Sequence, residues 1–310
     1  MNLYPYNPDS QRLKTGKSAI DRAFGAHFQV SAANAVAADA DGIMALTGLT
    51  AAAQEVTAGI TDPAVLRNVT ITGNASGITG TVTVNGTNSD DEVISEDLAA
   101  SGTSTVAGTK AFKTVTSVEL PVRAHTPAYQ TETIEVTHGC STAGDITVAV
   151  TAAALGGASP KSATVTLTTD DDTVTEVAAK IVTALNSDTA IGAAFTASNV
   201  AGVITLTADA YAANDATLAI AATVGSTGVT VGSSTNGTAG VAQDKISVGF
   251  GSTLGLPMKL AHNTCLFAFL DNTKESTAPT ITTSTTAVES NTITLNSALS
   301  GKVVDAYFLI

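Results

Sequence analysis

Short stretches in which apolar and polar residues alternate constrain the fold of this chain most strongly. "NVTITG" (68–73) and "GTVTVNGTN" (80–88) place valine or isoleucine at every second position, with threonine or asparagine between them. Such period-two alternation is typical of a β-strand with one buried and one solvated face. Val82 and Val84 are therefore predicted to share the buried face. Asn85-Gly86 predicts a two-residue hairpin turn directly after them.

The same alternation occurs on both sides of a middle segment that has a different character. "DEVISEDL" (91–98) and "FKTVTSVELP" (112–121) predict further strands before it, and several strands are predicted again from Asp244 onward. Antiparallel strands joined by short turns favour a sandwich or a jelly roll. We therefore predict a mainly β chain in which residues 26–128 and 243–310 form one composite β-sandwich or jelly-roll-like domain.

The middle segment, residues 131–240, is predicted to be an inserted β-rich module, because exposed loops tolerate insertions. Its single helix is predicted at about residues 173–186, within "TTDDDTVTEVAAKIVTALNSD" (168–188). Thr173 and Glu176 have the spacing of a capping box, and the three preceding aspartates would lie at the positive end of the helix dipole.

An apolar stripe supports the helix, because valine, isoleucine and leucine recur on one helical face at Val174, Val177, Ile181 and Leu185. The three aspartates are therefore predicted to precede and cap a helix. The alternative is a bound cation, although three adjacent aspartates do not match the alternating ligands of a calcium loop.

Composition limits the classes of protein that this chain can belong to. The chain has 310 residues, of which only 4% are aromatic and none is tryptophan, so its cores must consist of Val, Ile, Leu and Ala. Its net charge is −13, and an acidic surface repels phosphate backbones, so nucleic acid is not predicted as a partner. No apolar run approaches the length of about 20 residues that crosses a bilayer, so no membrane span is predicted.

Basic residues gather at the start of this acidic chain. Residues 1–25 are predicted to form an extended arm that carries Tyr4, Tyr6, Arg12, Lys14 and Lys17. The segment is polar and lacks an apolar core, so a secretory signal is not expected. One interpretation is a solvated terminus. The other is a basic arm that binds a partner through these five residues.

The two cysteines do not predict a disulfide framework. Two inert thiols are the favoured interpretation of Cys140 and Cys265, ahead of a disulfide or of a zinc site shared with His138 and His262. Cys265 alternates with the two phenylalanines of "CLFAFL" (265–270). This spacing predicts that the face they share belongs to the core.

A search for catalytic patterns gives no candidate. The chain contains no G-x-S-x-G motif, and "GFGSTLG" (249–255) is followed by no helix that could bind a phosphate, so a turn-rich loop is predicted there. "DADGI" (39–43) lacks the remaining ligands of an EF-hand. Without a paired histidine or an apolar pocket, no acid–base pair can be nominated. The sequence therefore predicts neither an enzyme nor a cofactor.

Two outer segments of the chain resemble a known family. "TDPAVLRNVTITGNASG", "GTKAFKTVTSVELP", "GLPMKLAHNT" and "ESNTITLNSAL" are similar to small virion structural proteins of tailed bacteriophages, of the head decoration or capsid auxiliary type. Separately, "TLTTDDDTVTEVAAKIVTALNSD" and "FTASNVAGVITLTADA" are similar to a module of phage tail sheath, tube and fibre proteins. In the decoration family the first segment continues almost directly into the last, so the inserted module is a departure.

The resemblance implies a non-enzymatic virion protein that decorates or cements a capsid. Its expected partners are the major capsid protein or other virion proteins, and further copies of itself, for example in a trimer. Neither nucleic acid nor membrane is expected to bind. The implied location is the capsid surface, after synthesis in the host cytoplasm. Many copies on a symmetric shell multiply weak contacts.

Two other functions remain as alternatives. A phage tail component, such as a tube, sheath-associated or fibre protein, is favoured by the inserted module. A carbohydrate-binding adhesin is disfavoured by the scarcity of aromatic residues, which stack on sugars.

Deletion of residues 1–22 tests the predicted arm. The deletion is expected to weaken assembly while leaving the thermal transition of the β-fold unchanged, which sedimentation and calorimetry would measure. Loss of the transition would show instead that this segment belongs to the core.

Overall fold

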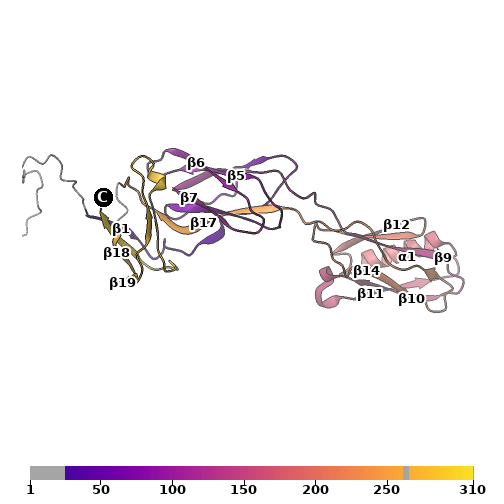
Figure 1. Cartoon of the computed structure of the whole chain (residues 1–310). Helices are drawn as coiled ribbons and strands as arrows, with labels where there is room; N and C mark the ends of the chain where they lie inside the picture. The colour runs from indigo at the N-terminus through magenta and orange to yellow at the C-terminus, as the bar shows by residue number, and fades with distance from the viewer. Residues whose placement is uncertain (1–24, 261–264, 310) are drawn as a thin grey trace, which may run out of the picture.

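The computed structural model describes residues 25–260 and 265–309. The predicted partner-binding residues Tyr4, Tyr6, Arg12, Lys14 and Lys17 lie outside these ranges. Strands make up 47% of the chain and helices 8%, which confirms the predicted mainly β fold. Figure 1 shows an elongated molecule with a larger body formed by the two outer segments and a smaller body formed by the middle segment.

Two antiparallel sheets form a sandwich in the larger body. One sheet has the order β20-β21-β17-β4-β7, with β2 also paired to β17, and the other has the order β3-β8-β5-β6. The strands of the first sheet are β2 (Asp39–Gly48), β4 (Arg67–Gly73), β7 (Val106–Phe112), β17 (Lys245–Gly255), β20 (Thr280–Thr282) and β21 (Thr292–Thr294). Those of the second are β3 (Gln54–Val56), β5 (Thr81–Thr87), β6 (Val93–Ala99) and β8 (Thr114–Leu120).

The core between these sheets follows the predicted alternation. Val82 and Val84 of β5 are both fully buried, as their spacing predicts, and they face Val69 and Ile71 of β4 within one apolar cluster. Of the threonines between them, Thr83 of β5 is half-buried, whereas Thr70 of β4 is buried. Aliphatic side chains thus fill a thin interior without tryptophan.

The predicted hairpin turn at Asn85-Gly86 is wrong, because both residues lie inside β5 and pair with β6. The chain turns instead between Asn88 and Glu92, where the buried Asn88 side chain accepts a hydrogen bond from the Glu92 N–H at 3.0 Å. A side chain at Gly86 would collide with the carbonyl oxygen of Thr114 in β8. This glycine is needed for the close approach of a neighbouring strand.

The predicted turn-rich loop at residues 249–255 is also wrong, because these residues form the second half of β17. A Cβ at Gly249 would collide with the backbone of β2 at Asp39, and a Cβ at Gly251 would collide with the side chain of Asn68. The glycines of "GFGSTLG" therefore let three strands approach one another closely.

A third sheet closes one end of the larger body and has the order β1-β22-β18-β19. It contains β1 (Gly25–Val30), β18 (Cys265–Leu270), β19 (Thr273–Lys274) and β22 (Val304–Leu309). Its inner face packs Ala268, Leu270 and Val304 against Leu254 of β17 and Ile293 of β21. The first and last strands of the described chain therefore lie side by side.

The smaller body contains two further sheets and a helix around one core. Their orders are β11-β10-β14 and β12-β13-β9-β15, with β16 also paired to β9. The strands are β9 (Thr131–His138), β10 (Gly144–Thr151), β11 (Lys161–Leu167), β12 (Phe195–Val200), β13 (Val203–Ala208), β14 (Ala219–Thr223), β15 (Thr230–Val231) and β16 (Thr235–Asn236). Short 3-10 helices occur at Ala153–Ala158 in this body and at Val288–Ser290 in the larger one.

The helix α1 (Val174–Ser187) lies where the sequence predicts it. Its capping box is present, because the Thr173 side chain accepts from the Glu176 N–H while the Glu176 carboxylate accepts from the Thr173 N–H. Val177, Ile181 and Leu185 point into the core of the smaller body. The helix ends at Ser187, and the side-chain amide of Asn186 exchanges two hydrogen bonds with the backbone of Ala197 in β12.

Replacement of both capping residues, Thr173→Ala with Glu176→Ala, is expected to lower the stability of the smaller body by about 1–2 kcal/mol. The amides of α1 should then exchange faster with solvent, which hydrogen exchange measures locally. Thr183→Ala, on the exposed middle of the same helix, serves as the control and should leave exchange unchanged. Equal effects of the two changes would contradict a specific capping role.

Candidate functional site

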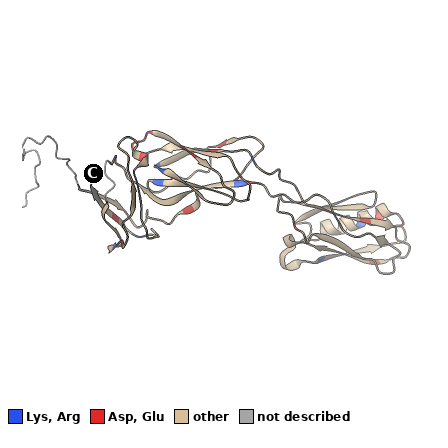
Figure 2. Cartoon of the chain, viewed as in Figure 1, with Lys and Arg blue, Asp and Glu red and all other residues tan. Residues whose placement is uncertain are grey.

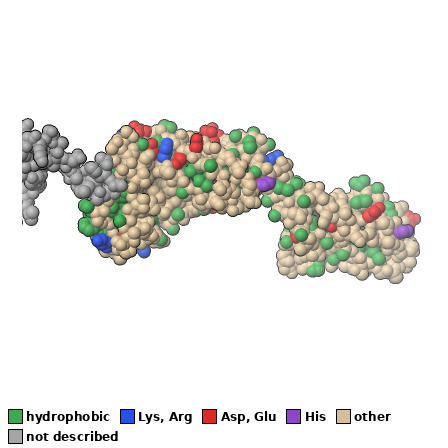
Figure 3. All heavy atoms as spheres, viewed as in Figure 1, with side chains coloured by type: hydrophobic (Ala, Val, Ile, Leu, Met, Phe, Trp, Pro, Cys, Tyr) green, Lys and Arg blue, Asp and Glu red, His purple; other side chains and the backbone are tan. Residues whose placement is uncertain are grey.

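The outer face of the third sheet carries a cluster of aromatic side chains. We call Phe267, Phe269 and Tyr307, with His27 and Lys274 at the margin, the aromatic face. The strand register places His27, Tyr307 and Phe267 in one row across β1, β22 and β18. Phe269 and Lys274 are paired in the next row. The space-filling view shows hydrophobic side chains gathered at this end of the molecule (Figure 3).

The rings of the aromatic face contact one another. His27 stacks on Tyr307 with ring centroids 4.5 Å apart, and Phe269 meets Tyr307 edge-on at 6.4 Å. Phe267 lies 6.5 Å from Phe269, and the Lys274 ammonium lies 5.1 Å from the Phe267 ring centroid. Phe267 is nevertheless 48% exposed and Tyr307 39% exposed.

The prediction that this face belongs to the core is therefore wrong. The alternate residues Ala268 and Leu270 are the buried ones. Both faces of β18 are apolar, so alternation alone does not decide which of them points inward. A bulge between Cys265 and Phe267 further shifts the register at the start of the strand.

Polar groups and a hollow border the aromatic rings. The Asp305 carboxylate lies 2.8 Å from His27 Nε2 and accepts a hydrogen bond of 2.8 Å from the Gln29 amide. Beside Phe267 and Lys274 a hollow of about 190 Å³ extends to Pro279. An apolar cavity of about 150 Å³ holds a benzene molecule, so this hollow has room for one aromatic side chain.

A second polar cluster lies where the two bodies join. The buried Asp244 carboxylate accepts hydrogen bonds from the N–H groups of Ala124 and His125, at 2.8 and 2.7 Å, and lies 2.9 Å from His125 Nδ1. Burial raises the pKa of Asp244, but the bonds from His125 and Ala124 outweigh it and lower the pKa below its usual value. A bridge between Ala128 and Val241 links the same two connecting segments.

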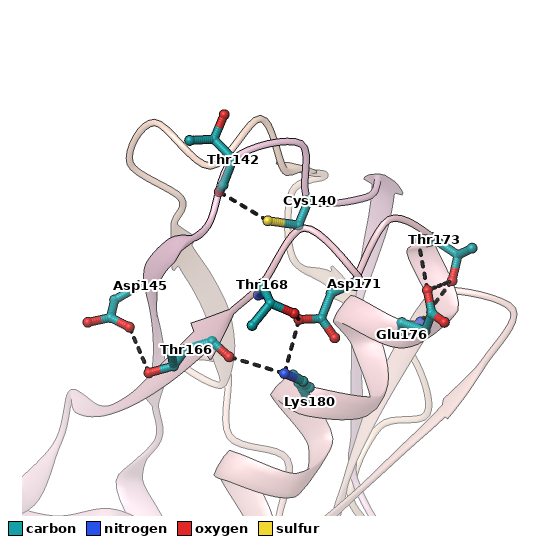
Figure 4. A network of polar contacts seen from close by, with 9 residues as sticks. All are labelled: Cys140, Thr142, Asp145, Thr166, Thr168, Asp171, Thr173, Glu176 and Lys180. Carbon is teal, nitrogen blue, oxygen red and sulfur yellow. Dashed lines mark hydrogen bonds and ion pairs between the residues drawn. The ribbon is translucent and has the colours of Figure 1, made fainter.

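The three aspartates before α1 have distinct environments, and Figure 4 shows the polar contacts of the middle one, Asp171. Asp171 is buried, accepts from Thr168 N–H at 2.7 Å and forms an ion pair of 3.0 Å with Lys180. The bond from the Thr168 N–H lowers the pKa of Asp171, with a further contribution from Lys180 against the opposing effect of burial. Asp170 and Asp172 are exposed. Asp171 therefore joins the end of β11 to the middle of α1.

The cysteines are both free thiols, so the disulfide alternative is wrong. Cys140 is buried and donates to the Thr142 carbonyl at 3.1 Å, whereas burial raises the pKa of Cys265. His262, a ligand of the weighed zinc site, lies outside the described residues. Within residues 25–260 and 265–309, no group of three or more His, Cys, Asp or Glu side chains could hold a metal ion.

Arg67 is almost fully buried in β4, and no sequence pattern predicts this burial. Its Nη1 donates to the Val36 carbonyl at 2.9 Å, and its guanidinium lies 4.8 Å from the centroid of the Phe250 ring. Burial lowers the pKa of Arg67 to about 10, so the group stays charged at neutral pH. Its surroundings make it a packing residue between the strands.

Comparison with protein-family models, with curated proteins and with solved structures finds no match to this chain. Among the described helices, none has the length and apolar character needed to cross a bilayer.

Asp171→Asn is expected to lower the stability of the smaller body at neutral pH by about 1–3 kcal/mol, because charge-assisted hydrogen bonds are lost. Since the folded pKa lies below the unfolded value of about 3.9, the contribution is complete above that value and disappears as the pH falls toward the folded pKa. The native chain and the variant should therefore converge in acid.

Hydrogen exchange of the α1 amides at neutral and acidic pH measures this dependence. Asp170→Asn is the matched control, because it removes an exposed carboxylate from the same run. If both substitutions shift the pH dependence equally, the specific role of Asp171 is wrong.

Proposed function

We propose that this chain is a non-enzymatic virion structural protein of a tailed bacteriophage that decorates or cements the capsid. One observation carries the proposal. The aromatic face and both ends of the described chain lie at one pole of an elongated molecule, and the 131–240 body lies at the opposite pole (Figure 1). Such a chain has one end suited to attachment and another suited to projection from a surface.

The attachment end has the chemistry of a protein interface. Exposed aromatic side chains are enriched among the residues that anchor protein interfaces, and Phe267 and Tyr307 lie side by side on neighbouring strands of one sheet. Elsewhere charged residues are thinly scattered over both bodies (Figure 2). A small anchoring area suits a repeated component, since many copies multiply a modest affinity per contact.

The projecting end is held by its junction. The Asp244 cluster clamps the segment entering the smaller body to the segment leaving it. The body beyond the junction has its own core, so it can extend from a shell without support from neighbours. The partners in this proposal are the major capsid protein or other virion proteins, together with further copies of the chain. The location is the capsid surface of the virion.

Quantitative mass spectrometry of purified particles tests the proposal. The phage whose genome encodes this chain should carry it in a fixed, symmetric ratio to the major capsid protein. A few copies per particle, confined to the neck or tail, would assign the chain to the tail instead. Absence from the particle would contradict a virion role altogether.

A further inference from the structure

We propose that the aromatic face receives residues 1–24 of a second copy of this chain. The inference deepens the proposed function. It rests on that function because it treats the chain as a repeated component. It assigns a receptor surface and an occupant, so that each copy donates one segment and receives another.

The aromatic face is unusual within this chain. The whole sequence holds only 8 Phe and 5 Tyr residues, yet Phe267, Phe269 and Tyr307 gather on one outer face with no described element packed over it. Aromatic rings are the largest apolar groups available here, and leaving them in water forgoes much of their burial energy. A partner that covers the face recovers this energy.

The position of β1 places the start of the described chain beside this surface. Gly25 is the first residue of β1, which is an edge strand of the same sheet and pairs with β22 alone among the described strands. A segment of 24 residues spans at most about 80 Å when fully extended, which is enough to reach a neighbouring molecule.

Charge favours the same pairing. Residues 1–24 contain four basic and two acidic residues and therefore have a net charge of +2. Since the whole chain has a net charge of −13, residues 25–310 have a net charge of −15. The bodies of two copies therefore repel each other, whereas the N-terminal segment of one copy is attracted to the body of another.

The residue types of the segment fit the surface. Lys274 lies over the Phe267 ring, so the rings of this face attract cations, and Arg12 or Lys14 of the second copy would lie over a ring that Lys274 does not cover. The adjacent hollow of about 190 Å³ has room for Tyr4 or Tyr6. The segment thus offers both kinds of group that this face can bind.

Exchange between copies has a geometric consequence. Because donor and receptor are different surfaces of the same chain, two copies can exchange their segments reciprocally in a two-fold dimer, or each copy can pass its segment to the next in a ring such as a trimer when the rotation allows. Donation to the chain's own face would give a monomer. An experiment that measures self-association can therefore distinguish residues 1–24 of a second copy from residues 1–24 of the same chain as the occupant of the face.

The test uses two full-length variants and their mixture. The receptor variant carries Phe267→Thr and Tyr307→Thr, and the donor variant carries Tyr4→Ser, Tyr6→Ser and Lys14→Gln. Sedimentation velocity over a concentration series should show self-association of the native chain, weakened at least about tenfold in each variant alone. Mixing should restore one contact, and with it a heterodimer, because the donor variant retains an intact face and the receptor variant an intact segment.

A matched control carries Val93→Thr and Val200→Thr, two side chains that are 86% and 79% exposed outside the third sheet. This control should associate like the native chain, and circular dichroism should show equal folding of all variants. Normal association of the receptor variant would overturn the inference. So would a mixture that stays monomeric, or a native chain that is monomeric up to about 1 mM, which indicates donation within one chain.

A photo-crosslinking measurement avoids loss of the rings. Phe267 is replaced by p-benzoylphenylalanine, and copies labelled with ¹⁴N and with ¹⁵N are mixed. The peptide crosslinked to position 267 should come from residues 1–24, and some crosslinks should join a ¹⁴N copy to a ¹⁵N copy while others join copies of the same isotope. Crosslinks confined to one isotope, or to another part of the chain, would overturn the inference. The copy number in virions is measured separately, so capsid decoration can hold even if this contact fails.

Discussion

The pairing of β17 with β2 and β4 is the interaction on which the rest of the structure depends. β17 follows the inserted segment and enters the sheet between two strands from the first third of the chain. Ile246 and Val248 are completely buried there. Glycines at 249 and 251 permit the close approach of the neighbouring strands. Without this long-range pairing, the core of the sandwich would lose the strand that joins the two outer segments within it, and the inserted segment would have no fixed base.

The same strand connects the two ends of the larger body. Asp244, directly before β17, clamps the junction with the smaller body, while Leu254, near the end of β17, packs in the core beneath the aromatic face. One continuous strand thus runs from the end that carries the smaller body toward the end that carries the aromatic face. The proposed role in a capsid rests on the separation of these two ends. This separation follows from the length of β17 and from the places along it where the neighbouring residues are buried.

Local patterns predicted what depends on local physics. Alternation identified the buried face of β5, and Thr173 with Glu176 identified the start of α1, because strand faces and helix caps are determined within a few residues. The predictions at Gly86 and Gly249 were wrong because glycine occurs both in turns and where two strands approach closely. Only the position of the neighbouring strand distinguishes a turn from a close approach. The aromatic face was assigned to the core because alternation does not tell inside from outside when both faces are apolar. Asp171 could not be separated from its two neighbours without the position of Lys180.

The orientation of the chain on a particle tests the account most directly. In a reconstructed virion, the third sheet should lie at the inner radius, against the shell or a neighbouring copy, and residues 131–240 should lie at the outer radius. Density that places the 131–240 body against the shell, with the aromatic face directed into solvent, would contradict it.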